Sequence, residues 1–169
     1  MTLDNPALSH PLDLYFRHNL WANLLLLDSC ATLDEAQLAA TAAGTYGSIR
    51  ATLGHLTFAE ERYIFHITKG QQMAGAVRPT ADTSLEELRA RVQTSSETLL
   101  HFATTLDGAR QVRVGAGDDA ILIPIAFLLL QAIHHGSEHR THVETILGQL
   151  GLDPPGLSGW RYFEEQFEA

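Results

Sequence analysis

The chain has 169 residues, of which 45% are hydrophobic and 18% charged, a composition that fits a folded globular protein and argues against disorder. Eleven basic residues face twenty acidic ones, and the formal net charge of −9 disfavours both nucleic acid and an anionic membrane surface as partners. A single cysteine excludes an intrachain disulfide and a zinc site built from cysteines.

The sequence predicts neither a targeting segment nor a membrane span. Residues 1–12 are polar, contain two prolines and lack the basic start and apolar run of a signal peptide. The longest apolar stretch, residues 120–130, is interrupted by Pro124 and is shorter than the roughly 20 residues that cross a bilayer. We therefore expect a cytoplasmic protein.

Four long segments carry apolar residues at the three- and four-residue spacing of amphipathic helices. Thr83 or Ser84, ahead of two glutamates, forms a capping box at the start of the third segment. Gly70 and Gly151 mark the ends of the second and fourth segments. The predicted helices span residues 12–31, 48–69, 83–106 and 124–150. Helices of about 20 residues are about 30 Å long, so the sequence predicts an all-α four-helix bundle.

Each of the three connections between these helices has a recognisable character. Residues 35–46 are predicted to form one or two helical turns, and residues 71–82 a polar loop. Residues 111–114 and 120–123 are short β-like runs around a glycine-containing turn, which predicts a small β-hairpin before the last long helix.

The tail, residues 156–169, carries four aromatic side chains and is predicted to pack back on the bundle as a short helix. No internal repeat, low-complexity tract or linker divides the chain. We therefore expect a single domain over residues 1–169.

Nine histidines stand out in the composition, and four of them lie between His134 and His142. His135 and His139 are four residues apart, so on a helix they share a face and can bind one metal ion. His142 lies on the same face, but the rise from His135 is about 10.5 Å, too far for two bonds of about 2.1 Å to one ion unless both rings bend steeply inward. The third ligand is therefore expected from elsewhere in the chain.

His55 is the best candidate for that ligand, because it lies inside the second predicted helix beside the core positions Leu53 and Leu56. The other histidines are His10, His18, His66, His101 and His134. The competing interpretation is that the pair on the fourth helix arose by chance and that each ring is a surface or hydrogen-bonded side chain. His134 and His142 are interpreted as neighbours of the site rather than as ligands.

Other catalytic signatures are absent from the sequence. No histidine is followed directly by glutamate, and no glutamate has a histidine three positions later, which excludes the zincin and di-iron helical motifs. The chain also has no glycine-rich phosphate loop and no Gly-x-Ser-x-Gly nucleophile elbow.

Three stretches, in the same order along the chain, carry a family resemblance. They read YFRHNLWANL at residues 15–24, SIRATLGHLTFAE at 48–60 and HGSEHRTHVETILGQL at 135–150. Together they resemble the DinB/YfiT-like family of metal-dependent bundle proteins. The resemblance implies a four-helix bundle with a long crossover, commonly a homodimer. It also implies a divalent metal ion, often zinc or nickel, held by three histidines that correspond by position to His55, His135 and His139.

The chain departs from the family pattern in two places. Thr141-His142 stands where the family often has Gly-Gln, and Gln131 stands where many members carry a further histidine. Neither change removes one of the three ligand positions. Both change the residues around the site relative to the family pattern. The substrates of better-known relatives are therefore a weak guide to the substrate of this chain.

Three neutral imidazoles leave a coordination position for water or substrate, the pattern of a catalytic metal site. A metal there would lower the pKa of a bound water or thiol. Because the resemblance includes thiol-dependent S-transferases and isomerases, we predict a metal-dependent transferase or hydrolase acting on a small molecule, with a thiol as a candidate substrate. The alternatives are a non-catalytic, stress-associated metal-binding protein and a purely structural protein without metal.

The catalytic candidates beside the histidines are Glu138 and Arg140. Glu138, Glu60 or Glu61 is a candidate hydrogen-bond acceptor or general base, although each is more often expected as a solvated charge on a helix face. Arg140 is a candidate to hold an anionic substrate group, and a surface ion pair is the equal alternative.

Overall fold

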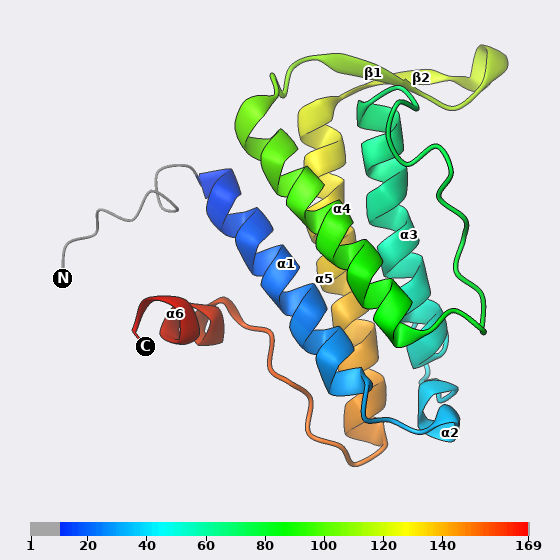
Figure 1. The fold of residues 1–169 in the computed structure, drawn as a ribbon, viewed down its shortest axis with the longest axis vertical. Coiled ribbons are helices and arrows are strands. Elements are labelled where there is room, and N and C mark those ends of the chain that lie inside the picture. The colour runs from blue at the N-terminus through cyan, green and yellow to red at the C-terminus, as the bar shows by residue number, and fades with distance from the viewer. Residues whose placement is uncertain (1–10, 169) are drawn as a thin grey trace.

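The computed structural model describes residues 11–168. Four long helices form the bundle: α1 (Pro11–Cys30), α3 (Ile49–Ile67), α4 (Leu85–Thr105) and α5 (Ile125–Gln149) (Figure 1). The smaller elements are the helices α2 (Glu35–Leu38) and α6 (Gly159–Phe167) and the strands β1 (Gln111–Val114) and β2 (Ile121–Pro124). The predicted all-α bundle, the hairpin and the short C-terminal helix are confirmed. Within residues 11–168, no helix has the length and apolarity that crossing a membrane requires.

The long helices begin and end within two residues of the predicted positions, because local capping signals fix their ends. Ser48 and Ser84 are the N-caps of α3 and α4, and the Ser84 hydroxyl accepts a hydrogen bond of 3.1 Å from the backbone N–H of Glu87. After α3, Lys69 and Gly70 both adopt the left-handed conformation, with φ of 53° and 80°, and turn the chain out of the helix.

The bundle joins its helices through a long crossover. Helix α1 packs antiparallel to α4, and α3 antiparallel to α5, whereas α3 and α4 run in the same direction (Figure 1). Residues 68–84 therefore return along the length of the bundle from the end of α3 to the start of α4 (Figure 1). The antiparallel hairpin β1–β2 covers one end of the bundle and leads into α5.

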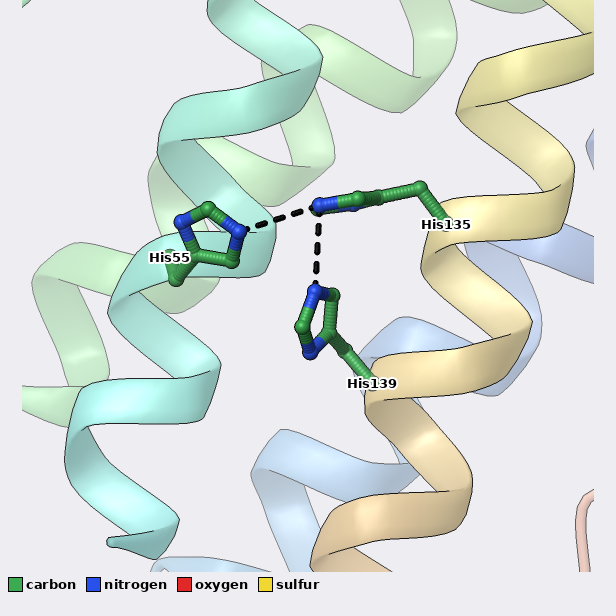
Figure 2. A group of neighbouring side chains, drawn as sticks. All are labelled: His55, His135 and His139. Carbon is green, nitrogen blue, oxygen red and sulfur yellow. Dashed lines mark hydrogen bonds between the residues drawn. The ribbon is translucent and has the colours of Figure 1, made fainter. Parts of the chain in front are cut away.

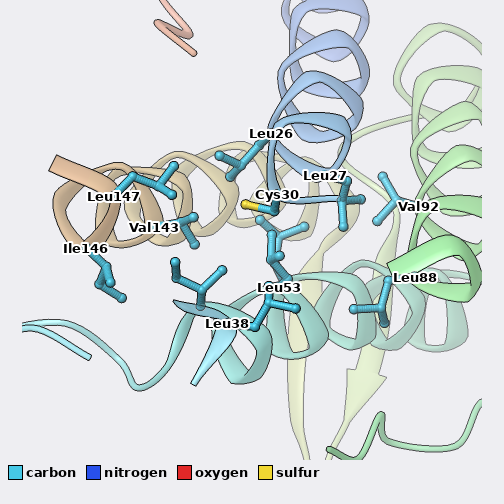
Figure 3. Close-up of a cluster of buried hydrophobic side chains, with 12 residues drawn as sticks. Leu26, Leu27, Cys30, Leu38, Leu53, Leu88, Val92, Val143, Ile146 and Leu147 are labelled. Atoms are coloured by element: carbon cyan, nitrogen blue, oxygen red, sulfur yellow. The ribbon is translucent and has the colours of Figure 1, made fainter. Parts of the chain in front are cut away.

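The core consists of two apolar clusters. The α2-end cluster, shown in Figure 3, includes Leu26, Leu27, Leu53, Leu88, Val92, Val143 and Ile146. The hairpin-end cluster includes Phe16, Ile64, Leu99, Phe102, Val112, Ile125 and Leu128. Along every long helix, the residues between these two sets include buried polar side chains.

The polar side chains between the clusters converge on Glu60 of α3, which is 2% exposed. One carboxylate oxygen accepts hydrogen bonds from the side-chain amides of Asn19 and Asn23 on α1, at 2.9 and 3.0 Å. The other oxygen accepts from the hydroxyls of Ser95 and Ser96 on α4, at 2.6 and 2.8 Å. One carboxylate therefore ties α1 and α4 to α3.

Arg140 brings α5 into the same network. Its Nη1 donates to the side-chain oxygens of Asn19 and Asn23, at 2.7 and 2.6 Å. Burial lowers the pKa of Arg140 to about 10, and the negative charges of Glu60 and Glu144 act against that fall. Burial likewise raises the pKa of Glu60, against the hydrogen bonds it accepts and the charge of Arg140. We call this set of residues the polar layer.

The surface positions expected for these charged residues are wrong. Glu60 lies in the polar layer, and Glu61 is 4% exposed and ion-paired with Arg91 at 2.6 Å. Arg140 is 5% exposed and, within residues 11–168, hydrogen-bonds to Asn19 and Asn23 in place of the surface ion pair that was one of its two expected roles. Partners from other helices satisfy these charges, and the local sequence does not show which distant residues will pair.

Gly136 of α5 makes room for the polar layer. A Cβ atom at this position would lie 2.9 Å from the side-chain oxygen of Asn19 and 3.0 Å from Nη1 of Arg140. Both atoms are fixed by buried hydrogen bonds, so neither can move away without breaking one.

We therefore expect Gly136→Ala to lower the free energy of unfolding by about 1–3 kcal/mol, the usual cost of overpacking. Gly148, on the same helix, is the matched control, since a Cβ there meets no atom within 4 Å. Gly148→Ala should raise stability by about 0.5–1 kcal/mol through helix propensity. Urea denaturation followed by circular dichroism measures both, and equal effects of the two substitutions would contradict this account.

Candidate metal centre

Three imidazoles meet between α3 and α5. Nε2 of His135 lies 3.0 Å from Nε2 of His55 and 3.0 Å from Nε2 of His139, and the three rings point toward one another (Figure 2). The three nitrogens all lie within 4.8 Å of one another. The structure thus brings together the three histidines expected to bind metal; we call them the histidine group.

The polar layer orients the histidine group. Successive residues of an α-helix are about 100° apart around its axis. Because Gly136 and Arg140 face the polar layer, the residues that precede them, His135 and His139, are turned toward α3. His55 meets them there, since α3 and α5 pack side by side.

The surroundings of all three imidazoles lower their pKa and so favour the neutral form. Burial lowers the pKa of His135 to about 4, and the charges of His55 and His134 add to the fall. Burial and the neighbouring histidines lower the pKa of His139 to about 4 as well. The pKa of His55 is lowered by burial and then by the charge of Arg78. Neutral imidazole is the form that offers a lone pair to a metal ion.

Two of the nitrogen spacings, those from His135 to His55 and to His139, fit a shared divalent metal ion. Two nitrogens bonded to one ion at about 2.1 Å lie about 3.0–3.4 Å apart for bond angles between about 90° and 110°. Both measured spacings, 3.0 Å, fall at the lower limit of that range. The group could hold a metal ion, and its three imidazoles would leave a coordination position for water or substrate.

Two tyrosines flank the histidine group. The ring of Tyr46 stacks on His55, with centroids 4.2 Å apart and planes 12° apart, and its edge meets His139 at 5.0 Å. Tyr63 meets His135 edge to face at 6.2 Å, and its hydroxyl is hydrogen-bonded to Gln131. These contacts hold the rings in place. Nothing in the local sequence distinguished either tyrosine.

The two remaining histidines of α5 lie beside the group. His142 contacts the ring of His139 at 5.3 Å, and within residues 11–168 the buried Nδ1 atoms of both rings have no hydrogen-bond partner. His134 is exposed, with Nδ1 3.5 Å from a carboxylate oxygen of Glu138. The histidines found elsewhere on the bundle are His18, His66 and His101, and His10 lies outside the described residues.

The two catalytic candidates occupy different environments. Glu138 is exposed on α5, and its negative charge acts on His139. Arg140 is committed to the polar layer, where its hydrogen bonds go to Asn19 and Asn23.

The comparison with known families agrees with this site. The model of the DinB family matches residues 7–168, nearly the whole chain. The chain therefore belongs to the DinB family, and its three-histidine group is compatible with metal binding. No curated protein matches the sequence.

We expect protein purified without a polyhistidine tag, saturated with Zn²⁺ or Ni²⁺ and then dialysed, to keep about one ion per chain. Replacement of His55, His135 or His139 by alanine should weaken the affinity by more than about 100-fold, because even the loss of a residue that only supports a ligand costs 10–100-fold. His101→Ala is the matched control and should bind as the wild type does. Metal content is measured by mass spectrometry, and equal content in the wild type and the triple variant would contradict the site.

Proposed function

We propose that this DinB-family chain is a metal-dependent enzyme. It would hold a divalent ion, zinc or nickel, through His55, His135 and His139, and activate a water or a low-molecular-weight thiol for hydrolysis of, or transfer to, a small molecule. The observation that supports this proposal is the convergence of three imidazoles, with Nε2 of His135 3.0 Å from Nε2 of both His55 and His139. A divalent ion bound there would lower the pKa of a water or thiol that it coordinates. Either molecule would then be a nucleophile near neutral pH.

The cysteine of the chain favours a thiol from outside. Cys30 is buried in the α2-end cluster, and burial raises the pKa of its thiol to about 12. At neutral pH this thiol is neither ionised nor accessible. Since it is the only cysteine, sulfur chemistry at the histidine group requires a free small-molecule thiol.

The remaining roles follow from the surroundings of each side chain. We propose Glu138 as the acceptor for the proton that leaves the thiol or water, because it is an exposed carboxylate whose charge acts on His139. Arg140 is a positioning residue, since its hydrogen bonds fix the face of α5 that carries the histidines.

We also propose that the protein is a homodimer, as the family resemblance implies. Tyr15 and Leu130 are exposed apolar side chains, on α1 and α5, and both line one groove. A surface of this kind favours association. Size-exclusion chromatography with light scattering should give twice the chain mass, and a monomer at every concentration would refute the dimer.

The proposed activity is tested with zinc- or nickel-loaded, tag-free protein. Glutathione, cysteine and 2-mercaptoethanol are each mixed with 1-chloro-2,4-dinitrobenzene, and the absorbance of the thioether product is followed; hydrolysis of 4-nitrophenyl acetate is measured in parallel. At least one reaction should run about tenfold or more faster than with metal-free protein. The acceleration over the metal-free protein should disappear in His139→Ala and persist in His101→Ala.

Two outcomes would exclude catalysis of this kind. One ion per chain without acceleration of any reaction favours the non-catalytic metal-binding role. Failure to retain either metal favours a structural protein.

A further inference from the structure

A pocket of about 200 Å³ opens beside the histidine group. Its lining includes Tyr46 and His55 together with Arg78 and Pro79 of the crossover. The same Tyr46 ring stacks on His55 and contacts His139. The pocket and the histidine group therefore share His55, and a molecule in the pocket lies next to that imidazole.

The crossover is fixed on both sides of Arg78. The preceding carbonyl, of Val77, accepts a 2.8 Å hydrogen bond from Arg91, which is itself ion-paired with the buried Glu61. The following residue, Pro79, packs against α3 at Gly54, where a Cβ would lie 3.1 Å from the Cβ of the proline. The pocket is therefore formed before any ligand enters it.

The two arginines that line the pocket differ in their partners. Arg50 binds both carboxylate oxygens of Glu35, at 2.7 and 2.9 Å, and also donates to the carbonyl of Thr83. Arg78 donates to the hydroxyl of Tyr46 at 3.0 Å, and residues 11–168 place no carboxylate within ion-pair distance of it. Its charge nevertheless acts on His55. Arg78 is thus a guanidinium beside the pocket without a counter-ion from the described chain.

We propose that this pocket binds the carboxylate of a small organic acid, with Arg78 as the counter-ion. A guanidinium presents its N–H groups in a planar fork that matches a carboxylate. One unneutralised cation at the pocket, in a chain of net charge −9, suits a monoanion better than a phosphate dianion. Ala51, Pro79 and the ring of Tyr46 offer apolar surface to the body of the acid.

Binding of the acid at Arg78 does not depend on the proposed function. Only its role as a substrate of the histidine group rests on that function. The substrate class would be a compact carboxylic acid with an apolar or aromatic body. The acid would be anchored at Arg78 and present its reactive end to the imidazoles along Tyr46.

Benzoate and its neutral isostere benzamide are the probes. Each is titrated into zinc-loaded and into metal-free protein, and binding is followed by the backbone amide NMR signals of Ala51, Gly54 and Ala81. Benzoate should shift these signals saturably in both forms, and benzamide should bind about tenfold or more weakly because it lacks the charge. Arg78→Gln should weaken the affinity for benzoate by about tenfold. Arg113→Gln, which removes an exposed arginine from β1, should leave the affinity unchanged.

Three results would overturn the proposal: no saturable shift, an unchanged benzoate affinity in Arg78→Gln, or binding in the zinc-loaded form alone. In the last case the carboxylate is bound by the ion and not by Arg78. Unchanged amide signals outside the pocket show that the variants are folded. Since the metal-free titration needs neither metal nor thiol, its outcome is independent of the turnover experiment, and either proposal can fail alone.

Discussion

The buried carboxylate of Glu60 is the interaction on which the arrangement of the bundle depends. An ion of this kind costs several kcal/mol to bring out of water unless donors surround it. Here four donors come from α1 and α4, and Arg140 of α5 completes the network through Asn19 and Asn23. Apolar contacts are non-directional, so they allow a helix to slide, whereas these hydrogen bonds form in one register only. We infer that the polar layer sets the register of all four long helices.

That register is also what assembles the histidine group. Gly136 and Arg140 face the polar layer, and the residues before them, His135 and His139, face α3. One stretch of α5 therefore serves the interior of the bundle and the candidate metal centre at once. A shift of α5 by one turn would move it about 5.4 Å and separate the ligands from His55.

The sequence predicts the helices and the hairpin, because local patterns of residues encode them. Apolar spacing and capping residues predicted the four helices, and the four-residue spacing of His135 and His139 predicted two of the three histidines of the site. The polar layer was not predictable, because Glu60 and its partners are more than 30 residues apart in the chain. Its one local signal is the pair Asn19 and Asn23, polar residues four apart among the buried positions of α1. Tyr46 and Arg78 lie in connections, where no periodicity assigns a position.

The end of α3 has a practical consequence. Lys69, which leaves that helix in the left-handed conformation, is exposed and is the only lysine of the chain. It lies fourteen residues beyond His55, about 21 Å along the helix direction. Amine-directed reagents therefore have a single side chain to modify, remote from the imidazoles. A fluorophore or surface tether attached there would report on the protein from a defined point without touching its candidate centre.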